Sequence, residues 1–173
     1  MSEPRFIGRH SGARGDWVRL RTLILIRHAK SDWDDPALDD HDRPLNPRGR
    51  LSAPRIGAWL TGQGTTPDAV LCSTARRTRE TWDGIASRLD HAPKPVFTRG
   101  LYHAAPADML AAICDSDATR LAVIAHNPGI GSLAWSLCAT PPDHPKFGIY
   151  PTGATLILRF DADHMSDIAP GQG

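Results

Sequence analysis

The chain has 173 residues, a length that suits one domain with a single large core. Twenty Lys and Arg residues against nineteen Asp and Glu give a formal net charge of +1, so no global field favours nucleic acid or an anionic membrane as a partner. No apolar run approaches the roughly 20 residues of a membrane span. Three cysteines without C-x-x-C spacing argue against a disulfide framework or zinc site and fit reduced thiols in the cytoplasm.

The two ends of the chain lack the apolar patterning of the middle. Residues 1–20 carry arginines and glycines but no apolar stretch of a secretory signal, and we interpret them as a flexible N-terminal extension. The patterned part, 21–161, is expected to form the domain. The remaining residues, 162–173, are mostly polar and predict a frayed tail.

Between these ends, apolar runs that predict strands alternate with segments of helical periodicity. Asn46 is the expected N-cap of the first helix, on whose inner face Leu51 and Trp59 are expected, and Ser73 or Thr74 is the expected cap of the second helix. The predicted elements, in chain order, are a strand at 23–26, a helix at 47–60, a strand at 69–72, a helix at 75–89, a weaker extended segment at 94–99, a helix at 106–114, a strand at 121–125, a helix at 129–139 and a strand at 154–160.

This alternation predicts the fold class. Strands that read as continuous apolar runs are buried on both faces, and helices between them supply the covering layers. The sequence therefore predicts an α/β protein, a three-layer α/β/α sandwich around a mainly parallel sheet.

Basic side chains stand where three of the predicted strands end. Arg27 and His28 follow the first strand, Ser73 closes the second with Arg77 just beyond it, and His126 follows the strand at 121–125. In open parallel sheets, ligands bind outside the carboxyl ends of the strands. The sequence therefore predicts that these groups converge on one site at that edge.

Two arginines and two histidines beside helix N-termini describe a site for an anion, and phosphate is the natural candidate. The guanidinium fork matches phosphate oxygens, and helix-start amides add donors. A histidine in such a site can attack phosphorus through a ring nitrogen and form a phosphohistidine intermediate. A second, protonated histidine is expected to stabilise the phosphoryl oxygens together with the arginines.

Four motifs in order carry a family resemblance. "RHAKSDW", "DRPLNPRG", "CSTARRTRET" and "AHNPG" together resemble the histidine phosphatase superfamily, and the compact length is similar to the SixA-type phosphohistidine phosphatases. The resemblance implies a phosphoglycerate mutase-like fold. It also implies that His28 is the nucleophile, Arg27 the adjacent phosphate ligand, Arg77 the second arginine and His126 the second histidine.

Other residues are expected around the phosphate with less support from the motifs. Arg43 is either an extra phosphate contact or the partner of a neighbouring aspartate. Ser73, Asn127 and His103 complete the predicted substrate-binding set. No metal or organic cofactor is expected.

The acid that many relatives use to protonate a leaving oxygen has no evident counterpart. The chain has two glutamates, Glu3 in the extension and Glu80 on a predicted helix exterior. The segment where the family places the acid offers His103 and Asp108, and the choice between them stays open. An imidazole leaves phosphorus more readily than an alkoxide, so the resemblance favours a phosphorylated protein or a small phosphoramidate as substrate.

Rival functions are a phosphomonoesterase of the same superfamily, a cysteine-dependent phosphatase, a metallohydrolase and a non-catalytic phosphopeptide-binding module. The cysteine chemistry requires Cys-x5-Arg, but the sixth residue after Cys72 is Thr78. The histidines show no metal-binding spacing. The presence of both motif histidines argues against a module that only binds phosphate, because the arginines alone would suffice for binding. The sequence predicts no oligomeric state.

Overall fold

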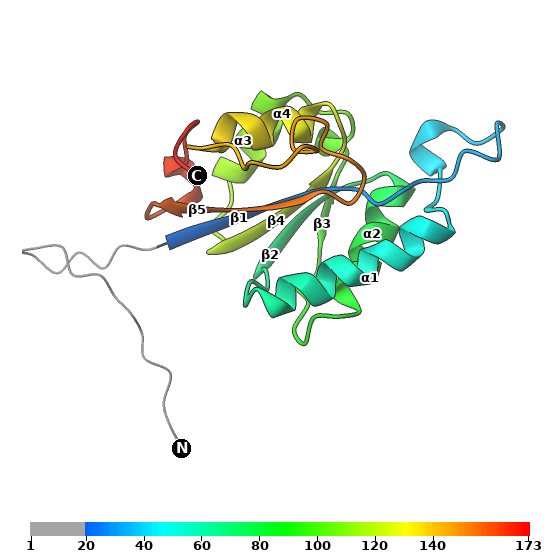
Figure 1. The fold of residues 1–173 in the computed structure, drawn as a ribbon, viewed down its shortest axis with the longest axis horizontal. Coiled ribbons are helices and arrows are strands. Elements are labelled where there is room, and N and C mark those ends of the chain that lie inside the picture. Colours follow the sequence, from blue (N-terminus) through cyan, green and yellow to red (C-terminus); the bar gives the residue numbers. More distant parts are fainter. Residues whose placement is uncertain (1–19) are drawn as a thin grey trace, which may run out of the picture.

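The computed structural model describes residues 20–173, so the predicted extension lies outside the described residues apart from Leu20. Five strands form one sheet in the order β3-β2-β4-β1-β5 (Figure 1). All neighbouring pairs are parallel except β1 and β5. The strands are β1 (Leu20–Arg27), β2 (Ala69–Ser73), β3 (Val96–Thr98), β4 (Arg120–Ala125) and β5 (Thr155–Asp161).

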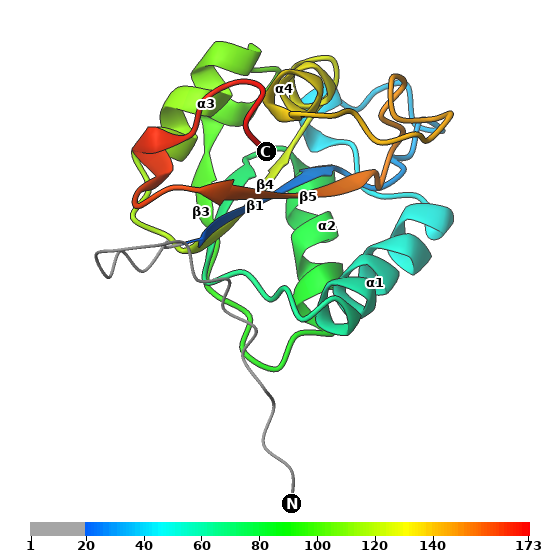
Figure 2. The same ribbon diagram turned by 60° about the vertical axis from the view of Figure 1, so that its left-hand side comes forward.

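Helices cover both faces of the sheet, as Figures 1 and 2 show. Side chains alternate along β1, so Ile24 and Ile26 pack with α1 and α2 while Leu23 and Leu25 pack with α3 and α4. This confirms the predicted three-layer α/β/α sandwich. The helices are α1 (Pro47–Gly62), α2 (Arg76–Ala86), α3 (Pro106–Cys114) and α4 (Gly129–Leu137), with short 3₁₀ turns η1 (Asp40–Asp42), η2 (Arg99–Leu101) and η3 (Met165–Asp167). None of these described helices is long and apolar enough to cross a membrane.

The register of the central strands brings their carboxyl ends level. Arg27 of β1 pairs with Ala125 of β4, and Cys72 of β2 pairs with Ile124 of β4. The residues that follow, His28 and His126, therefore leave neighbouring strands at the same height. The convergence that the sequence predicts follows from this register.

Of the two predicted helix caps, the one for α2 is wrong. Ala75, not Ser73 or Thr74, precedes α2 as its N-cap and makes no capping bond, because Ser73 Oγ bonds to His126 and Thr74 Oγ1 bonds to His41. On α1, Asn46 caps the helix as predicted by accepting a bond from the Gly49 amide.

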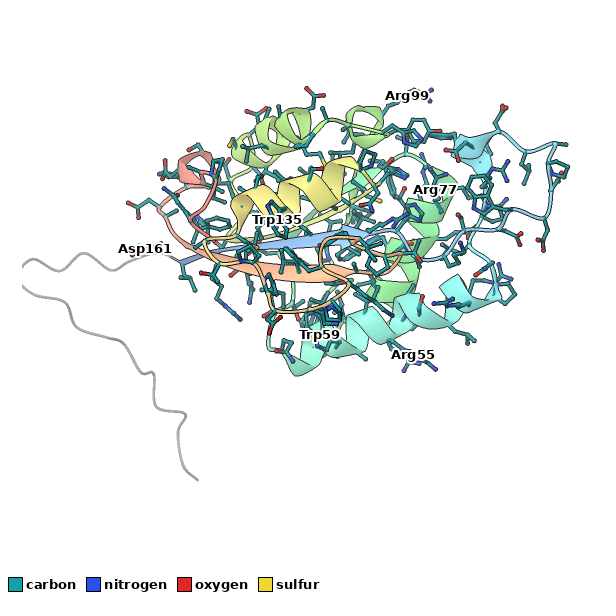
Figure 3. The ribbon with its side chains drawn as sticks, turned by 45° about the horizontal axis from the view of Figure 1, so that its top comes forward. Arg55, Trp59, Arg77, Arg99, Trp135 and Asp161 are labelled. Carbon is teal, nitrogen blue, oxygen red and sulfur yellow. The ribbon has the colours of Figure 1, made fainter. Side chains whose placement is uncertain are left out.

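The apolar face of α1 is narrower than the pattern indicates. Leu51 and Trp59, expected on the inner face, are 66% and 43% exposed, whereas Ile56 and Leu60 are buried. Figure 3 shows Trp59 on the α1 side of the molecule. Fewer side chains are buried than predicted because α1 packs against the sheet and α2 through one narrow row of residues along the helix.

The C-terminal segment is packed rather than frayed. Met165 and Ile168 are 1% and 4% exposed and belong to the core on the α3 and α4 side. The Gly171 and Gly173 amides donate to carbonyls of Ser136 and Leu137 at the end of α4. Two apolar residues in a polar tail are enough to anchor it, which the overall composition of the segment concealed.

Gly129 starts α4 in a position that leaves no room for a side chain. A Cβ atom there would lie 2.1 Å from the Ala104 carbonyl oxygen and 2.8 Å from Met109 Cε. We expect Gly129→Ala to lower the free energy of unfolding by about 1–3 kcal/mol, the usual cost of overpacking, measured by urea denaturation.

Gly62→Ala is the matched control. A Cβ at Gly62, the last residue of α1, meets nothing within 4 Å. Alanine is also the better helix former by roughly 0.8–1.0 kcal/mol in a helix interior. The control should be as stable as the parent or more so, and a Gly129→Ala protein of unchanged stability would contradict the packing described for α4.

Candidate active site

A pocket of about 310 Å³ lies at the carboxyl ends of β1 and β4 and contains the predicted basic groups. A larger cavity of about 520 Å³ beside β5 contains none of the strand-end residues and has mostly apolar walls. The smaller pocket is therefore the candidate site. Its walls are formed by Arg27, His28, Lys30, Ser31, Trp33, Asp40, Arg77, His103, His126, Asn127 and Thr152.

His28 is fixed in one tautomer by its two neighbours. Its Nδ1 lies 2.7 Å from the Ala29 carbonyl oxygen, which only accepts, so Nδ1 carries the proton. Its Nε2 lies 3.3 Å from Arg77 Nε, which only donates, so Nε2 carries a lone pair. His28 is thus a neutral imidazole, 6% exposed, whose basic nitrogen is on the pocket side with Arg77.

His126 is neutral for the same reason, with its tautomer reversed. Arg77 Nη2 donates to Nδ1 over 3.1 Å, so Nε2 carries the proton and donates to Ser73 Oγ over 2.8 Å. The ring centroids of His126 and His28 are 5.1 Å apart. The ring accepts a bond from a permanent cation here, so the second, protonated histidine expected beside a phosphoryl group stays a prediction.

Burial and cationic neighbours depress the pKa of both rings. Burial is the largest cause for His28 and, with Arg77 and Arg27, outweighs the Ala29 bond and lowers its pKa to about 4. Burial, followed by the charge of Arg77, lowers the pKa of His126 to about 2. Two uncharged imidazoles at neutral pH leave the arginines as the cations of the pocket.

Arg77 is the buried centre of the site. It enters from the first turn of α2, at the end of the sheet where the loop 29–45 leaves β1 (Figure 3). The guanidinium is almost fully buried, and besides both histidines it binds Asp40, through Nη2 to Oδ2 over 2.9 Å and through Nη1 to the backbone oxygen. The neighbouring Arg76 is exposed and pairs with Glu80 at 2.7 Å.

Arg27 is the second cation of the pocket. Its Nη1 donates to the Tyr150 carbonyl oxygen over 2.9 Å, whereas its buried Nε has no partner in the part of the chain that the structure describes. Burial and the charge of Arg77 lower the pKa of its guanidinium. The two like charges so close together favour a bound anion.

Asp40 is the site residue that the sequence did not reveal. Its Oδ2 accepts hydrogen bonds from Tyr102 Oη at 2.7 Å, from Arg77 and from His103 Nε2 at 3.2 Å. Burial opposes ionisation of Asp40, but these donors outweigh it and hold the pKa of its carboxyl well below the usual range. The only sequence signal is indirect: a buried arginine requires a carboxylate partner, and the loop 29–45 offers several aspartates.

The predicted substrate-binding residues lie in different settings. Ser73 is fully buried behind His126 and is absent from the pocket wall, so it orients that ring. Asn127 lines the pocket, but its Nδ2 donates to the Ile149 and Tyr150 carbonyls and thereby holds the 149–150 loop.

Arg43 stacks on the ring of Trp33, with its guanidinium carbon 4.3 Å from the ring centroid. Among the described residues it forms no ion pair, and its buried Nε and Nη1 have no partner. The predicted salt bridge to a neighbouring aspartate is therefore not formed in this structure. Arg43 is absent from the pocket wall, so its predicted contact with phosphate stays a prediction.

The fold places the two candidates for the general acid, His103 and Asp108, in different surroundings. His103 lines the pocket, its ring centroid 5.3 Å from that of His126, and its φ of 52° is a conformation that few non-glycine residues adopt. Asp108 lies on the exposed side of α3, outside the pocket wall. Glu80 accepts from the Leu45 amide at 2.7 Å and so anchors the loop.

The described residues give little support to a cysteine-dependent phosphatase or to a metallohydrolase. Burial, the largest cause, raises the pKa of the Cys72 thiol to about 12, so it is not a thiolate at neutral pH. Within residues 20–173, no group of three or more His, Cys, Asp or Glu side chains is arranged to hold a metal ion.

Comparison with known proteins identifies the family. The sequence profile of the histidine phosphatase superfamily (branch 1) matches residues 23–101. An uncharacterized protein of Mycobacterium tuberculosis is 37% identical over 153 residues, covering 84% of this chain and 93% of that protein.

Solved structures point to the same group. A candidate phosphohistidine phosphatase SixA from Nakamurella multipartitia is 30% identical, with a TM-score of 0.73 over 89% of this chain and 91% of that one. The protein histidine phosphatase SixA in complex with tungstate shares the fold, with 24% identity, a TM-score of 0.65, and coverage of 79% of this chain and 86% of that one. The chain belongs to the histidine phosphatase superfamily and is of the SixA type.

The neutral histidines make stability depend on pH. Between pH 6.5 and about 4 an unfolded histidine binds a proton while folded His28 and His126 do not, so acid favours the unfolded state. For each proton that the unfolded state binds and the folded state does not, the free energy of unfolding falls by ~1.4 kcal/mol per pH unit of acidification. We expect His126→Asn, whose Oδ1 replaces Nδ1 as acceptor, to lose less stability than the parent between pH 7 and pH 5 in urea denaturation. Equal losses would contradict the neutral state of His126.

Proposed function

We propose that this protein is a phosphohistidine-type phosphatase that hydrolyses its substrate through a phosphohistidine intermediate on His28. One observation carries the proposal: a neutral imidazole with its Nε2 lone pair in a pocket that also holds the buried Arg77 and the half-buried Arg27. A nucleophile needs that lone pair, and at neutral pH the low pKa of His28 keeps it free of a proton.

In the first step, His28 Nε2 attacks phosphorus and the bond from phosphorus to the leaving group breaks. Arg27 and Arg77, both in the pocket wall, neutralise the phosphoryl oxygens. The Ala29 carbonyl stabilises the positive charge that develops on the ring, because it accepts from Nδ1. A bound dianion also favours protonation of His126, which would then donate from Nδ1 to a phosphoryl oxygen.

In the second step, water attacks the phosphorus of phosphorylated His28. The bond between phosphorus and Nε2 breaks, its electron pair returns to the nitrogen, and inorganic phosphate leaves. The arginines serve both steps because the phosphoryl group stays between them.

The leaving group favoured by this site is an imidazole. Asp40 is the carboxyl group in the pocket wall, and its low pKa means that it carries no proton to give an alkoxide. A phosphohistidine protonated on its distal nitrogen leaves as neutral imidazole without that help. The substrate class we propose is therefore a protein phosphohistidine or a small phosphoramidate, met in the cytoplasm where the free thiols stay reduced.

His28→Ala is expected to abolish turnover of phosphoramidate and to leave no acid-labile phosphate on the chain after rapid quenching. Phosphate binding should weaken less than turnover, because both arginines remain. His91→Ala is the matched control, since His91 is an exposed histidine outside the pocket. Turnover by His28→Ala at the parental rate would refute the proposal.

Substrate preference is tested by comparing phosphohistidine peptides with p-nitrophenyl and alkyl phosphates. The value of kcat/KM should be higher for phosphohistidine. Equal or higher efficiency on alkyl phosphates would identify a phosphomonoesterase instead, and bound phosphate without any turnover would identify a binding module.

A further inference from the structure

A second acid–base group lines the same pocket as the proposed nucleophile. His103 Nε2 is 3.2 Å from Asp40 Oδ2, and the pocket that holds His28 and His126 includes both residues in its wall. Since a carboxylate only accepts, Nε2 carries the proton and Nδ1 is the basic nitrogen. This Asp–His pair has no part in the nucleophilic step described above.

The backbone also positions His103 unusually. Its φ of 52° costs energy for a residue with a Cβ, and such conformations concentrate where a side chain must be presented to a ligand. Tyr102, whose ring centroid is 4.3 Å from that of His103, holds the same carboxylate oxygen through its hydroxyl. The carboxylate is thus fixed by Tyr102 and Arg77 and in turn orients the imidazole.

The other titratable groups of the pocket wall are poorly suited to accept a proton. With the dianion bound, His126 Nδ1 already carries the proton that it donates to a phosphoryl oxygen, and Asp40 Oδ2 already accepts three bonds. The ammonium group of Lys30 has donors but no acceptor. Among the described titratable side chains of the pocket wall, His103 differs in three respects. Its side chain is half-exposed, its Nε2 is paired with a carboxylate, and no cation is bonded to its Nδ1.

We infer that His103, oriented by Asp40, is the general base that takes a proton from the water attacking phosphorylated His28. The inference rests on the proposed function and assigns its second step. The oxygen–phosphorus bond forms, the bond from phosphorus to His28 Nε2 breaks with its electron pair returning to nitrogen, and the water proton moves to His103 Nδ1. The first step needs no such group when the leaving imidazole carries its own distal proton, so the role of His103 falls on hydrolysis.

The test separates the two steps by rapid quenching with phosphoramidate as the probe. His103→Asn is the variant of choice, because asparagine tolerates a positive φ but accepts no proton. Formation of phosphorylated His28 should stay within about threefold of the parent, while its hydrolysis slows by roughly 100- to 10,000-fold, the usual contribution of a general base. Acid-labile phosphate should therefore accumulate on the chain.

Two further variants sharpen the result. His103→Gly should regain hydrolysis when free imidazole is added, a rescue that a purely structural role would not give. Asp40→Asn should slow both steps, since Asp40 also holds Arg77, whereas Asp39→Asn is the matched control because exposed Asp39 precedes η1 without a side-chain bond to it. The control should behave like the parent.

Each outcome decides the role of His103. Unchanged hydrolysis in His103→Asn, or equal slowing of both steps, would overturn the inference while leaving the nucleophile in place. Absence of acid-labile phosphate from the parent chain would instead contradict the proposed function, and this step with it.

Discussion

The guanidinium of Arg77 is the interaction on which the site depends. It donates to His28 from Nε and to His126 and Asp40 from Nη2, so one planar group sets the separation and orientation of all three. Because arginine has no acceptor and does not lose its proton, each imidazole must present a lone pair to it. The charge state of the site thus follows from the identity of a single residue.

The fold supplies this arrangement through strand register and the start of one helix. Parallel pairing of β1 with β4 leaves His28 and His126 at the same height, and β2 leads directly into α2, whose first turn carries Arg77. The outward bonds of the rings, from His28 to the Ala29 carbonyl and from His126 to Ser73, complete their orientation. A backbone carbonyl fixes His28, and a side-chain hydroxyl fixes His126, on the side away from the arginine.

The sequence predicted what depends on local pattern. Apolar runs identified four of the five strands, and a weaker extended segment indicated the fifth, β3. The positions at the strand ends pointed to Arg27, His28 and His126, because burial of a strand and emergence of its end are local properties. What it could not predict depends on contacts between distant segments: Asp40 is 37 residues from Arg77 and 62 from Tyr102, and nothing in an aspartate-rich loop marks it. The packed C-terminal tail was missed for the same reason.

The central claim is that Arg77 holds two neutral imidazoles in opposite tautomers. Long-range ¹H–¹⁵N NMR of the ligand-free protein at pH 6 measures this directly, because the two nitrogens of a neutral ring differ strongly in chemical shift. The account requires a protonated Nδ1 and bare Nε2 on His28, and a bare Nδ1 and protonated Nε2 on His126. Finding either ring as an imidazolium at pH 6, or both in the same tautomer, would contradict it.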